Sequence, residues 1–162
     1  MEIPQNLTTQ WQWSAFDQLA VQDLYALLAL RQDVFVVEQA CLFQDIDGVD
    51  QASWHLLGWQ VRDSQRELVA YLRCVPAGVK YPQASIGRVV SAASVRGTGL
   101  GLELFAQGLA RTLQACPGQV IRLAAQQRLE GFYAGFGFVT SSAPYLEDAI
   151  WHVDMLRPAD LA

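Results

Sequence analysis

Residues 96–101 have the composition of a turn that binds an anion. They read Arg-Gly-Thr-Gly-Leu-Gly and come directly before an expected helix. Glycines let backbone amides approach a ligand closely, and the amino end of a helix favours negative charge. Arg96 adds a fixed positive charge. The stretch therefore predicts a cradle for a phosphate or pyrophosphate. A glycine-rich helix start that binds nothing is the alternative.

Two familiar nucleotide-binding motifs do not fit this stretch. A P-loop places Lys and Ser or Thr after its last glycine, but Leu102 and Glu103 follow here. A dinucleotide-binding fingerprint has the spacing G-x-G-x-x-G and an acid about 20 residues further on. The glycines here alternate instead, and no acid occurs between Glu103 and Glu130. The stretch therefore predicts neither a P-loop nor a dinucleotide-binding turn.

The elements that must position this turn follow a mixed α/β pattern. No repeat or linker divides the chain, so residues 1–162 are expected to form one domain. Apolar residues recur at helical spacing in three segments and alternate, or run together, in six. Asp17 is a candidate cap for the first helix. The pattern predicts a hairpin over 55–75, with its turn at 63–67, and one βαβ crossover. Helices are expected near 18–39, 99–115 and 129–134, and strands near 9–15, 55–61, 68–75, 85–91, 120–124 and 150–156.

Composition narrows the class of protein further. Hydrophobic residues make up 52% and charged residues 17%, which excludes intrinsic disorder. The net charge of −5 argues against general binding of nucleic acid. No apolar run reaches about 18 residues and no signal peptide is evident, so we expect a cytoplasmic protein without a membrane partner. The three cysteines are far apart, and so are the two histidines, so no metal site is expected.

Two motifs resemble those of the GNAT acetyltransferases. Arg96, Gly99 and Gly101 match, in order, the (Q/R)-x-x-G-x-(G/A) pattern of the family's motif A. Residues 132–138, Phe-Tyr-Ala-Gly-Phe-Gly-Phe, resemble its motif B. The resemblance implies an α/β (α+β) GNAT fold, in which helices flank a central mixed, mostly antiparallel sheet. It also implies acetyl-CoA as the cosubstrate.

A further resemblance points to the ElaA subfamily and covers most of the chain. Residues 31–39 are similar to the start of its N-terminal signature, and Glu147, Asp148 and His152 are similar to its C-terminal one. The rest of the N-terminal signature is matched by Cys41, Phe43, Asp45, Asp47, Gly48, Asp50 and His55.

The resemblance implies a role for each motif residue. A strand that splays from its neighbour would bond the pantetheine arm of CoA, the glycine turn would cradle the pyrophosphate, and Tyr133 would be the general acid. The family often has Asn seven residues before that Tyr, where this chain has Gln126, so one contact to the arm is expected to change. The implied CoA-binding residues are Val89, Val90, Ser91, Arg96, Gly97, Thr98, Gly99, Leu100, Gly101, Leu102 and Gln126.

The general base and the acceptor site are left open by the sequence. Glu38 is the first candidate for the base and His152 the second, with His55 and Asp45 weaker and a relay water also possible. Asp45 and Asp47, with His55, are candidates for binding a cationic amine. Each of these residues has an ordinary alternative: a solvated loop acid or helix end, or a structural histidine.

We therefore expect an acetyl-CoA-dependent N-acetyltransferase that transfers the acetyl group directly to a primary amine. The acceptor, a small molecule or a protein amine, is not identified by the sequence. The alternative is a non-catalytic sensor or scaffold domain that binds acyl-CoA. Exposed tryptophans could serve a homodimer, although the five tryptophans of the chain could equally lie in its core.

Overall fold

The computed structural model describes residues 7–160 and contains an eight-stranded sheet. The strand order is β1-β2-β3-β4-β5-β8-β6, with β7 also paired to β8. Only β4 and β5 run parallel, and every other pairing is antiparallel. The strands are β1 (Gln10–Ala15), β2 (Trp54–Arg62), β3 (Gln65–Val75), β4 (Ala84–Ser91), β5 (Ile121–Gln126), β6 (Val139–Thr140), β7 (Tyr145–Glu147) and β8 (Ile150–Arg157).

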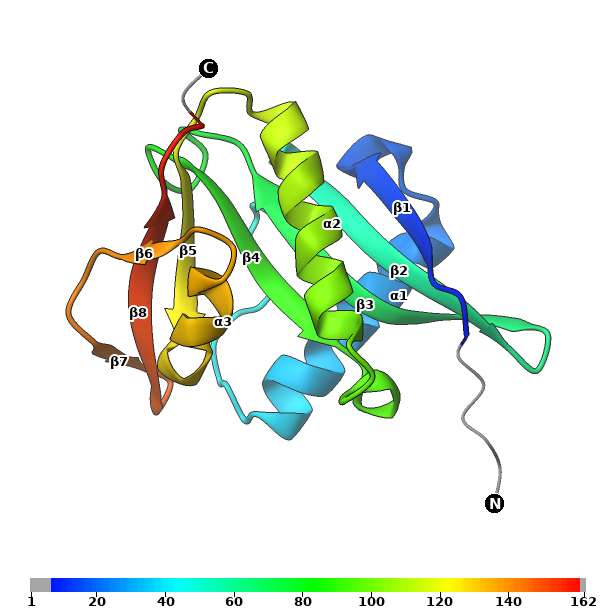
Figure 1. The fold of residues 1–162 in the computed structure, drawn as a ribbon. Helices are drawn as coiled ribbons and strands as arrows, with labels where there is room; N and C mark the ends of the chain where they lie inside the picture. The colour runs from blue at the N-terminus through cyan, green and yellow to red at the C-terminus, as the bar shows by residue number, and fades with distance from the viewer. Residues whose placement is uncertain (1–6, 161–162) are drawn as a thin grey trace.

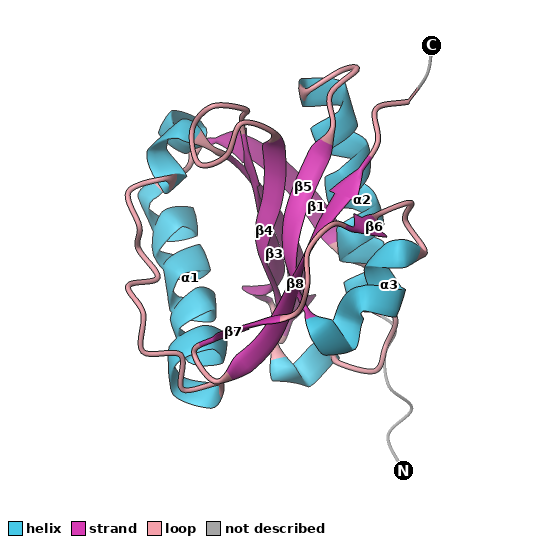
Figure 2. Cartoon of the chain, turned by 90° about the vertical axis from the view of Figure 1, so that its left-hand side faces the viewer, coloured by secondary structure: helices cyan, strands magenta, loops and turns pink. Residues whose placement is uncertain are grey.

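Helices cover both faces of the sheet (Figures 1 and 2). Helix α1 (Val21–Arg31) lies on one face and continues into a π-helical segment, η2 (Gln32–Glu38). Helices α2 (Leu100–Ala115) and α3 (Glu130–Ala134) lie on the other. The mixed, mostly antiparallel sheet with one crossover through α2 confirms the expected fold class. Within residues 7–160, no helix is both long enough and apolar enough to cross a membrane.

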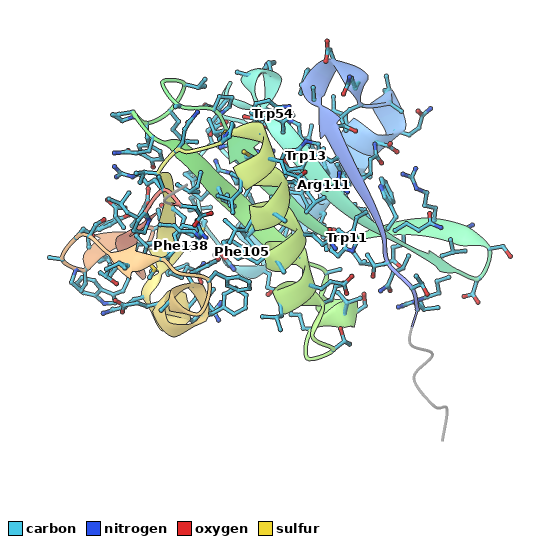
Figure 3. The ribbon with its side chains drawn as sticks, turned by 45° about the horizontal axis from the view of Figure 1, so that its top comes forward. Trp11, Trp13, Trp54, Phe105, Arg111 and Phe138 are labelled. Carbon is cyan, nitrogen blue, oxygen red and sulfur yellow. The ribbon has the colours of Figure 1, made fainter. Side chains whose placement is uncertain are left out.

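Each face of the sheet has its own apolar core. The larger core joins α2 and α3 to the sheet around Phe105, whose ring meets Tyr133 edge-on at 4.9 Å and Phe136 at 4.8 Å. Figure 3 shows Phe105 and Phe138 on one side of α2, with Trp11, Trp13 and Trp54 gathered on the other. The smaller core packs α1 and η2 on β2 and β3. The two cores fix where α1 and α3 stand relative to the sheet.

Three local predictions were wrong in detail. Residues Asp63 and Ser64 have positive φ angles of 50° and 61°, so a tight two-residue turn closes the hairpin and β3 already begins at Gln65. Asp17 lies in a separate 3₁₀ turn and does not cap α1, whose N-cap is Ala20. The first long helix is α-helical only to Arg31 and then widens into η2. The short strands β6 and β7 were not predicted.

Strands β4 and β5 pair only at their beginnings and then separate. The parallel ladder joins Ala84 to Ile121 and Ser85 to Arg122. Beyond this point β4 bulges outward against β3, where Arg88 has a φ of 53°. Such bulges bend a strand and end its pairing. The end of β4 therefore has no ladder to β5. This is the splayed strand that the GNAT resemblance implies for bonding the pantetheine arm of CoA.

Candidate active site

A cavity of about 690 Å³ opens where β4 and β5 separate. Its wall draws on strands β4, β5 and β8, on helix α3 and on the loops that follow η2 and precede β4. The size lies within the range of small-molecule sites in proteins. The predicted residues that it brings together are Asp47, Val89, Gln126, Tyr133 and His152.

The glycine turn follows β4 after a short 3₁₀ turn, Ala93–Val95, and leads into α2. Gly99 is the N-cap residue of α2 and has a φ of +88°, a conformation that favours glycine. A Cβ atom at Gly97, Gly99 or Gly101 would meet no protein atom within 4 Å, so the space above the turn is open. The first backbone amides of a helix have no partner within it. This turn therefore fits a pyrophosphate, and the Thr98 hydroxyl stabilises it by donating to the Val95 carbonyl at 2.6 Å.

Arg96 and Glu38 form an ion pair beside the turn. The two guanidinium nitrogens Nη1 and Nη2 donate to the carboxylate oxygens at 2.6 and 3.0 Å, and Nη2 also lies 3.3 Å from the Ser91 carbonyl oxygen. The hydrogen bonds from Arg96 lower the pKa of Glu38. Glu38 is also not among the residues that line the cavity. Glu38, the first candidate for the base, is therefore bound to Arg96 beside the glycine turn and does not lie on the cavity wall.

Tyr133 projects into the cavity from α3. Its ring is packed among Phe105, Phe132 and Phe138, and the residue is only 6% exposed. Burial raises the pKa of its hydroxyl to about 12. Within residues 7–160 this hydroxyl makes no side-chain hydrogen bond. It is therefore protonated near neutral pH and available to donate a proton.

His152 of β8 lies beside Gln126 of β5, because the two residues are register partners on adjacent strands. Its Nδ1 is 2.8 Å from the Ile150 carbonyl oxygen. Since a carbonyl only accepts, Nδ1 carries the proton of the neutral ring and Nε2 keeps its lone pair. The ring stacks on Tyr145, with centroids 5.9 Å apart and planes at 20°. This arrangement orients a proton acceptor on the cavity wall.

Gln126 is held by its neighbours on both sides. Its amide nitrogen donates to Gln39 at 3.3 Å, and its amide oxygen accepts from Nε of Arg128 at 3.2 Å. Val90 is buried, and with Ser91 it pairs with β3, so these residues can offer a ligand only what that pairing leaves free. Gln126 of β5 and Val89 of β4 both line the cavity that opens between these strands.

The predicted acceptor acids belong to a network of buried charges. Arg31 pairs with Asp45 and with Asp50, each at 2.8 Å, and Arg73 pairs with Asp50 and Asp47, also at 2.8 Å. Burial alone would raise the pKa values of Asp47 and Asp50, but the hydrogen bonds from the arginines outweigh it and lower both. Asp45 does not line the cavity, and only Asp47 reaches it. These acids are engaged by arginines and are not free to attract an amine.

His55 contacts this network through Asp50 and does not line the cavity. It is 0% exposed, its Nε2 donates to the Asp50 carbonyl at 2.9 Å, and its Nδ1 accepts from the Tyr71 hydroxyl at 2.7 Å. Burial lowers the pKa of the ring, which is therefore neutral. With both nitrogens satisfied, His55 stabilises the fold, and the structure does not bring it to the acceptor.

The family model of the acetyltransferase (GNAT) domain matches residues 59–157. The chain belongs to the GNAT acetyltransferase family. Among relatives, it is 40% identical over 150 residues to the protein ElaA of Escherichia coli strain K12, covering 91% of this chain and 95% of that protein. It is also 40% identical over 146 residues to a UPF0039 protein of Synechocystis sp., covering 90% and 93%.

Solved structures of GNAT relatives agree with the fold. A crystal structure of an acyl-CoA N-acyltransferase from Pseudomonas aeruginosa superposes with a TM-score of 0.86 at 39% identity, covering 93% of this chain and 99% of that one. The crystal structure of E. coli ElaA gives 0.85 at 39% identity, with the same coverage. This chain therefore has the acyl-CoA N-acyltransferase fold of the GNAT family, resembles ElaA over most of its length and is an acyltransferase.

Sequence reasoning did not single out several residues of this GNAT site. Arg88, Lys80 and Tyr145 all line the cavity. Arg88 stands at the bulge of β4 and Tyr145 on an unpredicted strand, so neither lay within a recognised motif. Lys80 had one usable signal, since it is the only lysine of the chain.

Proposed function

We propose that this GNAT protein transfers an acetyl group from acetyl-CoA directly to a primary amine of a small molecule or a protein. One observation carries the proposal. An opening between β4 and β5 has Tyr133 and His152 on its wall, and the open glycine turn, which is not part of that wall, follows β4 after a short 3₁₀ turn. The turn would hold the pyrophosphate of CoA, and the separated end of β4 would bond the arm that carries the acetyl thioester.

Protons move at both the amine nitrogen and the leaving sulfur during the reaction. An amine with a pKa near 10 must lose a proton before it attacks the thioester carbon. His152 is the proposed acceptor of this proton through Nε2, because Nδ1 is fixed on the Ile150 carbonyl. Once the C–N bond has formed, the nitrogen must lose a second proton. As the C–S bond breaks, Tyr133 would give its proton to the departing thiolate and would regain one from this nitrogen, directly or through water. The oxyanion formed on the way would accept a hydrogen bond from a backbone amide of β4 near Val90.

His152 replaces Glu38 as the proposed base for geometric reasons. Glu38 is bound to Arg96 through both carboxylate oxygens, and this pairing lowers its pKa. A stronger acid is a weaker proton acceptor near neutral pH. His152 lies on the cavity wall, and its Nε2 makes no hydrogen bond to the part of the chain that the structure describes, residues 7–160. We assign Glu38 to the positioning of Arg96.

The first test is a titration of the purified chain with acetyl-CoA and with free CoA, followed by a broad panel of amines. Acetylation of any amine, with release of CoA, would support the enzyme. Binding of acetyl-CoA without acetylation across the panel would favour the alternative, a sensor or scaffold domain that binds acyl-CoA. The absence of any binding would refute both. A comparison of acetyl-CoA with longer acyl-CoAs would test the acyl group, and a homodimer stays a prediction.

A further inference from the structure

The charged side chains of the cavity wall fall into two groups. Most of them are paired. Asp47 is engaged by Arg73 and Arg88, and Asp154 accepts from Arg122 at 2.8 Å. Charges that already neutralise each other offer little to a charged ligand, because breaking a partly buried pair is costly. The recognition of an acceptor therefore depends on the charges that have no partner.

Four charged residues that line the cavity take no part in the ion pairs found among residues 7–160. They are Lys80 in the loop before β4, Arg128 after β5, and Glu147 and Asp148 at the turn between β7 and β8. Arg128 is engaged by the Gln126 amide oxygen at 3.2 Å, which leaves Lys80, Glu147 and Asp148 to a charged ligand. Burial lowers the pKa of Lys80, Arg88 and Arg73 lower it further, and Asp47 and Glu147 act in the opposite direction. A carboxylate of a ligand would be stabilised by this unpaired ammonium.

The unpaired charges stand on opposite sides of His152. Glu147 pairs in register with Ile150, on one side of His152 along β8. Lys80 lies at the other end, since it and Arg122 both approach the ring of Tyr81, at 5.5 and 4.2 Å, and Arg122 is bound to Asp154. Ile150, His152 and Asp154 are every second residue of β8, so they share one face of the strand, and all three line the cavity. The wall therefore runs from negative, past the proposed base, to positive.

We infer that the acceptor is a small molecule that carries a primary amine and, several bonds away, a carboxylate. This inference rests on the proposed function and names its substrate class. Glu147 and Asp148 would draw the ammonium group towards His152, and Lys80 would bind the carboxylate. The class excludes simple monoamines and polyamines as preferred acceptors, because neither has an anion for Lys80.

The strand gives a measure for the separation of the two groups, because Asp154 stands at the end of the wall where Lys80 lies. His152 and Asp154 are two residues apart on β8, which corresponds to about 7 Å. An extended chain covers ~1.2 Å per bond, so the amine and the carboxylate carbon would be separated by about six bonds. 6-Aminohexanoate has this length, and so does lysine measured from its side-chain amine. Glycine and β-alanine are too short to reach both ends.

The test is a chain-length series with the full chain and acetyl-CoA, with release of CoA as the readout. The acceptors are glycine, β-alanine, 4-aminobutyrate and 6-aminohexanoate, with hexylamine as the partner that lacks the carboxylate. We expect kcat/KM to rise along the series and to be about tenfold or more higher for 6-aminohexanoate than for hexylamine, as for one charged hydrogen bond. Equal or better turnover of hexylamine would overturn the inference.

Two variants separate recognition of the carboxylate from general effects. Lys80→Gln should erase the advantage of 6-aminohexanoate and leave hexylamine unchanged, whereas Glu147→Gln should lower kcat/KM for both acceptors. Arg62→Gln removes an exposed charge that does not line the cavity and should change neither. If Lys80→Gln lowered both acceptors equally, the lysine would be merely structural and the inference would fail.

Failure of this inference is distinguishable from failure of the proposed function. If none of the series is acetylated, the substrate class is wrong. The proposed function is then judged separately, by binding of acetyl-CoA and by the broad amine panel. A protein that binds acetyl-CoA and acetylates only amines without an anion would keep its function and lose this acceptor class.

Discussion

Replacing Glu38 with Gln distinguishes the two roles considered for this carboxylate. If Glu38 is the general base, the variant loses the group that takes a proton from the amine. If it holds Arg96, the variant only releases that guanidinium, because Gln keeps the size of the side chain and one oxygen acceptor. The structure supports the second role, since both carboxylate oxygens are occupied by Arg96 at 2.6 and 3.0 Å.

The two roles predict effects of different size and in different quantities. Loss of a general base lowers kcat by about 10²- to 10⁴-fold. Release of Arg96 makes its guanidinium available to the pyrophosphate. Both side chains of the pair are well exposed, at 40% and 45%, so solvent screens their attraction. Exposed pairs of this kind limit the gain to a factor of about 5 or less in the dissociation constant of CoA. We expect slightly tighter CoA binding and a kcat within a few-fold of the parent.

The assay is calorimetry of CoA binding together with steady-state kinetics on one acetylated amine, at two salt concentrations. The gain in affinity should shrink at high salt, because screening already weakens the pair. Asp160→Asn is the matched control. It breaks another exposed pair, Arg157–Asp160 at 3.0 Å, away from the glycine turn. A hundredfold fall in kcat with unchanged CoA affinity would refute the positioning role and restore Glu38 as the base.

Four further predictions concern other residues. Tyr133→Phe removes only the hydroxyl from a ring that stays packed, so kcat should fall by about 10²- to 10⁴-fold with CoA binding almost unchanged, and full activity would remove this residue from the mechanism. Gly99→Val fills the open space above the turn and strains a φ of +88°, so CoA should bind at least tenfold more weakly while circular dichroism shows a folded chain; unchanged affinity would place the pyrophosphate elsewhere. Asp50→Asn leaves two buried arginines without their shared carboxylate and should cost about 3–5 kcal/mol in denaturant unfolding, against almost nothing for Asp160→Asn. The pKa of His55 in the folded chain lies below its ordinary value of 6.5, so the unfolded chain binds the extra proton first. Stability should therefore fall as the pH drops below about 6.5, and His55→Gln should flatten that slope in thermal unfolding.

The sequence was most informative where local chemistry decides the structure. The alternating and helical patterns located β2, β3, β4 and α2 to within a few residues, because each has one face that must be buried. The glycine turn was recognisable because its conformation requires glycine at Gly99. Tyr133 was found by its place in a motif, and its burial among phenylalanines agrees with the apolar residues around it in the sequence.

Partners distant along the chain could not be read from the sequence. Glu38 and Arg96 are 58 positions apart, and no local pattern indicates that they meet. The sequence analysis ranked Glu38 before His152 as the base. Nothing local could test that order, because it depends on which side chain faces the cavity and which is already paired. The strand β7, which brings Tyr145 and Glu147 to the cavity, has only three residues and is too short to show a period.

The acidic loop is the clearest case in which sequence reasoning found the right residues and the wrong use for them. Asp45, Asp47 and Asp50 resemble a site for a cation when they are viewed alone, because the arginines that neutralise them come from α1, β3 and β4. In the structure the acids fix the arginines. Arg88, held by Asp45 at 2.8 Å, stands at the bulge of β4 and lines the cavity. Asp47 itself reaches the cavity, but Arg73 and Arg88 pair with it. Under the proposed acceptor class, the charges that would select the acceptor are therefore those of Lys80, Glu147 and Asp148.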